Sequence, residues 1–170
     1  MMRPVKPEDA AAICAIYNYY IESTIISFEE TLLQAAEMEE RIRKISAKFP
    51  YFVWEDDAVG AANGEISGYA YINTWKERSA YRYSAEISIY LKHDLLGRGI
   101  GSKLMAGFLE EVRKTEIHTL VAGITIPNEK SVALHEKFGF RKIAHFTEIG
   151  RKFDNWIDVG YWELILPPSK

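Results

Sequence analysis

Apolar and polar positions alternate along several short stretches of the chain, which predicts β-strands with one buried face. The alternation is clearest at residues 84–91, where apolar residues are separated by Glu86, Ser88 and Tyr90. Other strands are expected at residues 3–6, 51–55, 66–73, 119–126, 143–148 and 156–166, with turns around residues 60–64 and 150–155. One face of the strand at 84–91 would therefore carry a carboxylate, two hydroxyl groups and an aromatic ring.

Other stretches repeat apolar residues at helical spacing. A helix is expected over residues 7–23, and a largely solvated one over residues 33–49, which are rich in Glu, Lys and Arg. A third carries apolar residues at positions 104, 105, 108, 109 and 112, and a short fourth helix lies between Asn128 as N-cap and Gly139 after its end. This order predicts an α/β fold, with a mixed central sheet and helices on both faces.

Composition narrows the class of protein. The 170 residues are 48% hydrophobic and 26% charged, as expected of a single globular domain over residues 1–170. No apolar run approaches the roughly 20 residues that span a bilayer, and the first ten residues lack the apolar middle of a signal peptide, so a cytoplasmic protein without membrane contact is expected. The net charge of −3 gives no reason to expect nucleic acid. Cys14 is the only cysteine and lies in an apolar stretch, where a buried side chain is expected rather than a nucleophile. The four histidines lack metal-ligand spacing, so no metal is expected.

The strand at 84–91 leads into a turn that contains Gly97, Gly99 and Gly101. Glycines between a strand and a helix let main-chain N–H groups approach an anion, and phosphate is the usual one. Ser102 or Leu104 stands where the third glycine of a dinucleotide fingerprint would be, and the lysine-containing nucleotide loop is absent. A tight turn that needs glycine for its geometry alone is the alternative interpretation.

A second group of residues makes the phosphate interpretation more specific. Ser131 and His135 share a face of the short helix after Asn128. The order of these elements resembles the core of the GNAT N-acetyltransferases. That order is strand, glycine turn, helix, strand, Asn, short helix, Gly-Phe and strand. Residues 16–29, 75–90, 133–140 and 150–164 are similar to the phosphinothricin and methionine sulfoximine acetyltransferase branch of that family. The resemblance implies the GNAT (acyl-CoA N-acyltransferase) fold.

The resemblance also implies acetyl-CoA as co-substrate. Its expected contacts are Ser88, Ile89, Tyr90, Leu96, Gly97, Arg98, Gly99, Ile100, Gly101, Ser102, Asn128 and Ser131. The family usually has Gln or Arg at the position of Leu96, so a weaker grip on the phosphates is expected here. Main-chain donors of the turn would then carry more of the affinity.

Two residues are candidates for moving protons. A free amine is mostly ammonium at neutral pH, so a base must take its proton before it can attack a thioester. Glu86 projects from the polar face of its strand and could be that base; the alternative is an ordinary surface carboxylate. His135 stands where many family members have a tyrosine. It could assist Glu86 or protonate the departing thiolate, or it could be a structural histidine bonded to a main-chain carbonyl.

The acceptor side is inferred from the segment before Glu86. Arginine binds carboxylates in a bidentate manner, so Arg78 and Arg82 suit an amino acid. The expected acceptor-binding residues are Phe28, Trp75, Lys76, Arg78, Tyr81 and Arg82, with Tyr83 as a further apolar wall. The resemblance implies a homodimer, in which Trp156, Tyr161 and Trp162 could lie at the interface or in the core.

The expected function is direct acetyl transfer to the α-amino group of a small amino acid or analogue, such as phosphinothricin, methionine sulfoximine or a methionine derivative. One alternative is another amine as acceptor: a protein N-terminus, a lysine, a polyamine or an aminoglycoside. Another is a non-catalytic module that only binds acetyl-CoA.

Overall fold

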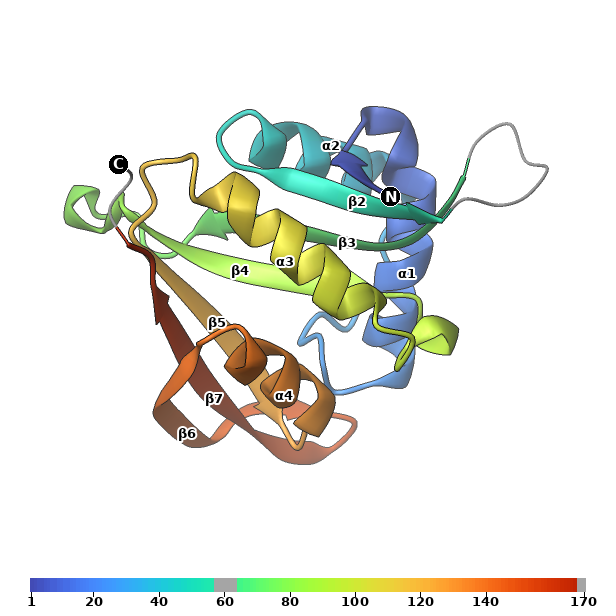
Figure 1. Ribbon diagram of the computed structural model, residues 1–170. Coiled ribbons are helices and arrows are strands. Elements are labelled where there is room, and N and C mark those ends of the chain that lie inside the picture. The colour runs from blue at the N-terminus through green and yellow to red at the C-terminus, as the bar shows by residue number, and fades with distance from the viewer. Residues whose placement is uncertain (57–63, 168–170) are drawn as a thin grey trace. The chain divides into compact units, whose positions relative to one another are not determined.

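The computed structural model describes residues 1–56 and 64–167, in which seven strands form a mixed sheet of order β1-β2-β3-β4-β5-β7-β6. The strands are β1 (Met2–Pro4), β2 (Tyr51–Asp56), β3 (Glu65–Thr74), β4 (Ser84–Leu91), β5 (Thr119–Ile126), β6 (Arg141–Lys152) and β7 (Asn155–Ile165). The α-helices are α1 (Ala10–Ser23), α2 (Ala35–Ser46), α3 (Ile100–Val112) and α4 (Glu129–Lys137) (Figure 1). The pairing of β4 with β5 is parallel, while β1–β2, β2–β3, β5–β7 and β6–β7 are antiparallel. The predicted mixed sheet is confirmed.

The chain divides into two compact units, and each of them is assembled from separate stretches of sequence. The first unit consists of Met1–Tyr19, Leu33–Ile72 and Ser88–Val112. The second consists of Tyr20–Leu32, Asn73–Ile87 and Arg113–Lys170. Each unit therefore consists of three separate stretches of chain, and β4 contributes residues to both units. That residues 1–170 form a single domain stays a prediction.

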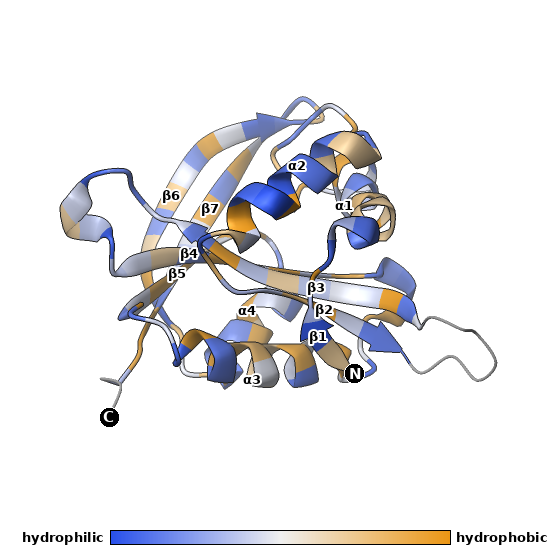
Figure 2. Ribbon diagram, turned by 90° about the horizontal axis from the view of Figure 1, so that it is seen from above, coloured by the Kyte–Doolittle hydropathy of each residue, from blue (hydrophilic) through white to orange (hydrophobic). Residues whose placement is uncertain are grey.

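In the first unit, helices cover both faces of the sheet. Helices α1 and α2 lie on one face of β2 and β3, and α3 lies on the other (Figure 2). The apolar residues expected to recur along α3 are all buried: Leu104, Met105, Phe108, Leu109 and Val112. Helix α2 buries only Met38 and Ile42, which agrees with a largely solvated helix. The helical periodicity in the sequence therefore identified the faces that pack on the sheet.

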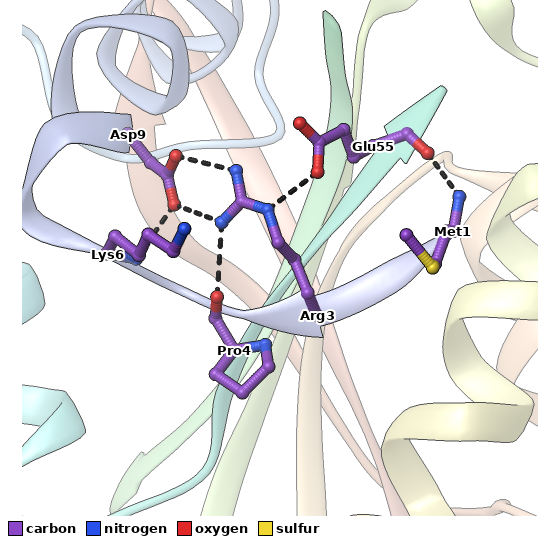
Figure 3. A network of polar contacts seen from close by, with 6 residues as sticks. All are labelled: Met1, Arg3, Pro4, Lys6, Asp9 and Glu55. Carbon is purple, nitrogen blue, oxygen red and sulfur yellow. Dashed lines mark hydrogen bonds and ion pairs between the residues drawn. The ribbon is translucent and has the colours of Figure 1, made fainter. Parts of the chain in front are cut away.

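A network of ion pairs fixes the start of the chain in this unit (Figure 3). The guanidinium of Arg3 on β1 donates two hydrogen bonds to Asp9, of 2.8 and 2.9 Å, and one of 2.7 Å to Glu55 on β2. The main-chain N–H of Lys6 also donates to Asp9, at 2.8 Å. Burial alone would raise the pKa of Asp9, but these donors together hold it below its usual range.

In the second unit, α4 covers one face of β5 and β7. Trp162 of β7 is 2% exposed, and its indole N–H donates to Glu136 of α4 at 3.0 Å. Asn128 caps the helix, because its side-chain oxygen accepts from the Ser131 N–H at 3.2 Å. Gly139 follows the helix with a φ of 91°, as expected of a glycine that ends it. The two ends of α4 are thus where the sequence placed them.

The hairpin of β6 and β7 reverses within the predicted turn, but β6 is longer than predicted. A turn was expected around residues 150–155, but β6 continues to Lys152 and Gly150 pairs with Ile157. The chain reverses at Phe153 and Asp154, whose φ angles of 50° and 60° lie in the left-handed region. The reversal is therefore within the expected range, although such two-residue turns usually carry glycine or asparagine rather than Phe-Asp. The other expected turn lies mostly at residues 57–63, outside the described residues.

Candidate active site

The glycine turn belongs to the first unit and has the conformation of an anion site. Gly97 and Gly99 have φ angles of 83° and 80°, which L-residues with a side chain rarely adopt. A Cβ atom added at either glycine would meet nothing within 4 Å, so the requirement is conformational rather than steric. Helix α3 begins directly afterwards at Ile100, which aims its free N–H groups and positive dipole end at the turn. These residues fit a phosphate-bearing ligand.

Other expected cofactor residues lie on β4 beyond its last residue paired with β5, which is Glu86. The ring of Tyr90 packs edge-on against Tyr17 at 5.2 Å and stacks with Tyr69 at 5.4 Å, between ring centroids. Because the Tyr90 side chain is used in packing within the first unit, a ligand contact here would involve main-chain groups, as for Ser88 and Ile89. Leu96 is 37% exposed.

Glu86 of the second unit lies beside an aromatic group that the strand pairings create. Its Oε1 atom is 3.5 Å from the position that a Cβ atom on Gly123 of β5 would take, and the Tyr161 ring of β7 is 3.3 Å from the same position. Tyr161 in turn makes edge-on contacts with Trp75 at 5.7 Å and with Phe146 at 5.5 Å. The missing side chain at Gly123 therefore lets a carboxylate and a phenol approach one another on one face of the sheet.

The surroundings of Glu86 favour its protonated form. Burial raises the pKa of its carboxyl group, and the ammonium of Lys76 only partly offsets this. Within residues 1–56 and 64–167, no hydrogen bond is donated to the Glu86 carboxylate. Burial, and then the nearby Glu86, also raises the pKa of Tyr161. A partly desolvated carboxylate that no protein donor occupies is suited to accept a proton.

His135 of α4 has a defined tautomer. Its Nδ1 atom lies 2.8 Å from the main-chain oxygen of Ser131, which can only accept, so Nδ1 carries the hydrogen. Burial lowers the pKa of His135, so the ring is neutral at pH 7. The Nε2 atom is buried and has no hydrogen-bond partner in the described part of the chain, a property it shares with Thr125 Oγ1. His135 therefore presents an unoccupied acceptor.

The two catalytic candidates lie on opposite faces of the sheet. Glu86 is paired with Val121, and Tyr161 with Gly123, which places these side chains on one face. Trp162, the neighbour of Tyr161, points to the other face, where it bonds to α4. His135 is on α4, so the interpretation of His135 as a direct partner of Glu86 gains no support. The described residues contain no hydrogen bond between the two.

The expected acceptor residues fall into two groups. The ammonium of Lys76 lies 4.9 Å from the centroid of the Trp75 ring, and its charge lowers the pKa of Glu86. Trp75, Lys76 and Glu86 therefore lie together. Arg82 is engaged locally: it donates to the Ser79 carbonyl at 3.2 Å and lies 4.3 Å from the Tyr83 ring centroid.

Arg78 and Tyr81 are exposed at the same short 3₁₀ turn, Ser79–Tyr81. No ion pair or hydrogen bond links the Arg78 side chain to any residue that the structure describes. Phe28 lies elsewhere, against Gly150 of β6, where an added Cβ atom would be 2.3 Å from its ring.

Sequence reasoning missed Gly123 and Phe146 and gave Tyr161 only an interface or core role. No local signal could have found them, because their proximity to Glu86 comes from strand register. The three C-terminal aromatic residues differ: Trp156 is 62% exposed, Trp162 is in the core, and Tyr161 is half-buried beside Glu86.

The described residues give little basis for metal binding or for a cysteine nucleophile. They contain no group of three or more His, Cys, Asp or Glu side chains that could hold a metal ion. Cys14 is buried, its thiol donates to the Leu33 carbonyl at 3.1 Å, and burial raises its pKa, all of which disfavour a nucleophilic thiolate. None of the described helices has the length and apolar character needed to cross a membrane.

Comparison with known proteins establishes the family. Residues 2–160 match the model of the acetyltransferase (GNAT) domain. The chain belongs to the GNAT acetyltransferase family. The fold and family predicted from the sequence are therefore confirmed, and the chain is a GNAT-type N-acetyltransferase.

Its relatives act on amino acids and their analogues. The chain is 32% identical to phosphinothricin N-acetyltransferase of Streptomyces viridochromogenes, with 98% of this chain and 90% of the relative covered. It is 31% identical to the L-amino acid N-acyltransferase of Escherichia coli, with 97% and 93% covered. Identity to the L-methionine sulfoximine/L-methionine sulfone acetyltransferase of Pseudomonas aeruginosa is 30%, with 95% and 92% covered.

Solved structures agree with the fold. A phosphinothricin acetyltransferase from Sinorhizobium meliloti in complex with acetyl-CoA superimposes with a TM-score of 0.91 at 29% identity, covering 98% of this chain and 88% of that one. A ribosomal-protein-alanine N-acetyltransferase from Brucella melitensis gives a TM-score of 0.91 at 32% identity, covering 98% and 99%. The chain is thus related to amino-acid and phosphinothricin acetyltransferases, and relatives of this fold bind acetyl-CoA.

Proposed function

We propose that this GNAT enzyme transfers the acetyl group of acetyl-CoA to the α-amino group of a small amino acid or analogue. Phosphinothricin, methionine sulfoximine and methionine derivatives are the acceptors that its relatives suggest. The observation that carries the proposal is Glu86, a half-buried carboxylate with a raised pKa. It has no hydrogen-bond donor among the described residues, and it lies beside the aromatic side chains of Trp75 and Tyr161.

Acetyl-CoA would be held mainly by main-chain groups. The turn from Leu96 to Ser102 and the start of α3 would bind its phosphates, because left-handed glycines and a helix N-terminus together present N–H groups. Ser88, Ile89 and Tyr90 would contact the pantetheine arm through the backbone of β4, and Asn128 and Ser131 are proposed as further contacts of acetyl-CoA. When bound, acetyl-CoA supplies an activated acetyl thioester.

Glu86 would act as the base. The amine nitrogen forms a bond to the acetyl carbon, the bond from that carbon to sulfur breaks, and the amine gives up a proton that the thiolate finally regains. Glu86 takes the proton from the amine, directly or through water, because its desolvated carboxylate binds a proton more readily than an exposed one. No covalent enzyme intermediate is needed.

His135 would relay a proton rather than supply one of its own. Its Nδ1 hydrogen is committed to the Ser131 carbonyl, and its Nε2 atom carries no proton while the ring is neutral. Nε2 must therefore accept a proton before it can pass one to the thiolate. This favours a part in the return of the proton over a role as the primary acid.

An anionic acceptor fits the positive charges of the segment before β4, of which Lys76 acts on Glu86. Lys76, Arg78 and Arg82 all lie in the segment before β4, and the Arg78 guanidinium is exposed. A carboxylate on the acceptor can pair with Arg78, while a polyamine or aminoglycoside would meet like charges. The aromatic side chains beside Glu86 would contact the apolar part of the acceptor.

The test is a thiol-release assay with acetyl-CoA and a panel of amines. It holds methionine sulfoximine, phosphinothricin, the common amino acids, spermidine, an aminoglycoside and a peptide with a free N-terminus. Saturable turnover confined to small amines that carry a carboxylate is expected. Methioninamide, which lacks the carboxylate of methionine, is the matched control and should react poorly. Turnover of methioninamide equal to that of methionine, or reaction of spermidine or the peptide alone, would refute the proposal.

Carboxylate recognition can be assigned to a residue with two variants. Arg78→Gln should raise the KM for methionine sulfoximine roughly ten- to a hundredfold, as the loss of a charged hydrogen bond does. Arg141→Gln, on the exposed start of β6, should leave it unchanged. Equal effects of the two changes on KM would refute the assignment of Arg78 to the acceptor site.

A homodimer is proposed as well. Several large apolar side chains of β6, of β7 and of the turn between them are exposed, namely Ile143, Phe146, Ile149, Phe153, Trp156 and Ile165. Exposed apolar side chains in such number suit a surface that a second copy covers. Light scattering after size exclusion should give twice the 19.5 kDa of one chain, and a mass of one chain at micromolar concentration would refute it.

A further inference from the structure

Lys152, the last residue of β6, is a lysine that its surroundings almost completely enclose. It is 3% exposed, and lysine is rarely buried to this degree unless its ammonium is paired. Its Nζ atom donates to the main-chain oxygen of Ser27 at 2.6 Å and lies 3.5 Å from that of Tyr20. The ammonium of Lys152 thus binds one carbonyl group in α1 and one in the segment that follows that helix.

The segment that follows α1 is held by side chains and local turns rather than by regular secondary structure. Residues 24–34 contain no helix or strand. Their hydrogen bonds include local ones, such as Ile26 N–H to the Thr24 hydroxyl at 3.1 Å, and one at the far end, where Leu33 N–H donates to Asn18 at 3.0 Å. Ser27 is nevertheless 3% exposed, so the chain is held inward at the point where Lys152 binds it. Burial lowers the pKa of Lys152 while Glu30 of the same segment raises it, so the segment also supplies a compensating charge.

The neighbouring residue Phe28 connects this contact to the proposed acceptor site. Its ring lies against Gly150, two residues before Lys152 on β6. Phe146 of the same strand contacts Tyr161, which stands beside Glu86. Strand β6 therefore joins the segment that carries Phe28 to the aromatic group around the proposed base.

We propose that Lys152 is a positioning residue that fixes the segment carrying Phe28 and so shapes the acceptor side of the active site. The inference rests on the proposed function, because it takes Phe28 to contact the acceptor. Lys152 itself does not touch the reacting atoms. Its loss should therefore weaken acceptor binding while leaving the binding of acetyl-CoA as it is.

The first test replaces Lys152 by methionine, which keeps the length of the side chain and removes its donors. Lys152→Met should raise the KM for the acceptor roughly ten- to a hundredfold, the change expected when buried carbonyls lose a charged donor. The KM for acetyl-CoA should stay within about twofold. Lys142→Met, which removes an exposed lysine of the same strand, is the control and should change neither.

Amide hydrogen exchange gives a readout that does not depend on the substrate. In Lys152→Met, exchange should accelerate at residues 24–32 and stay unchanged in β5 and α4. An unchanged exchange rate at residues 24–32, or an equal rise in both KM values, would overturn the proposal. If the wild-type enzyme acetylates no small amino acid, the proposed function fails, while the exchange result still decides whether Lys152 holds the segment.

A second variant serves if Lys152→Met does not fold. Gly150→Ala would force the Phe28 ring to move, because the new methyl group would lie 2.3 Å from it, while the bonds of Lys152 remain. It should raise the acceptor KM in the wild-type background and have no further effect in Phe28→Ala. Additive effects of the two changes would show that Gly150 does not act through Phe28 and would overturn the connection to the acceptor site.

Discussion

Replacing Glu86 by glutamine tests the mechanism most directly, because the change is expected to lower activity without lowering stability. Glutamine has nearly the same size but cannot take a proton from an amine. A positioned general base contributes roughly 10²- to 10⁴-fold to a rate, equal to about 3–5 kcal/mol of barrier. A fall of that size in kcat/KM is expected, with the Kd of acetyl-CoA unchanged.

The stability of the variant follows from the raised pKa. Because burial raises the pKa of Glu86 above its value in the unfolded chain, the folded state prefers the protonated carboxyl group. Its contribution to stability is fully present below the unfolded pKa and is lost as the pH rises through the folded pKa. Glutamine stays neutral, so at pH 7 the Tm of Glu86→Gln should equal or exceed that of the wild type, and the two should converge in acid.

The assay measures kcat/KM by thiol release and Tm by thermal unfolding on the same preparations. Glu163→Gln is the matched control, since Glu163 is paired with Val121, as Glu86 is, and therefore lies on the same face of the sheet. Retention of more than a third of the activity by Glu86→Gln would refute its role as base. A lowered Tm would show instead that the carboxylate stabilises the fold, contrary to the reasoning from burial.

Four further predictions concern the pH dependence of activity, the cofactor turn and, in two cases, the N-terminal network. The value of kcat/KM should fall on the acid side as Glu86 is protonated, at a pH above the ordinary range of a glutamate, and a flat profile would contradict this. Gly97→Ala should cost roughly 1–2 kcal/mol of folding or binding free energy, because its φ is 83°, and should raise the Kd of acetyl-CoA in calorimetry. Arg3→Ala should lower the free energy of unfolding by about 1–3 kcal/mol in urea titration, because it leaves Asp9 without its main donor. The lowered pKa of Asp9 contributes stability that is present above its unfolded pKa and lost as the pH falls through the folded one, so Asp9→Asn should flatten the acid limb of Tm against pH.

The sequence by itself determined the features that depend on neighbours along the chain. Strand β5 was predicted with its observed ends, and Asn128 and Gly139 bound α4 as expected. The left-handed glycines of the turn are visible in the sequence because only glycine adopts that conformation without strain. The alternation at residues 84–91 likewise placed Glu86 on the polar face of its strand.

Only the tertiary structure decided which distant residues meet. Strand register brings Gly123 and Tyr161 to Glu86, and it sets His135 on the face of the sheet opposite to Glu86. The burial of Lys152 is equally invisible in the sequence, where it reads as one more charge near a turn. A pattern along the chain reports the face that a side chain occupies, whereas the partner it meets there depends on pairing between segments far apart in sequence.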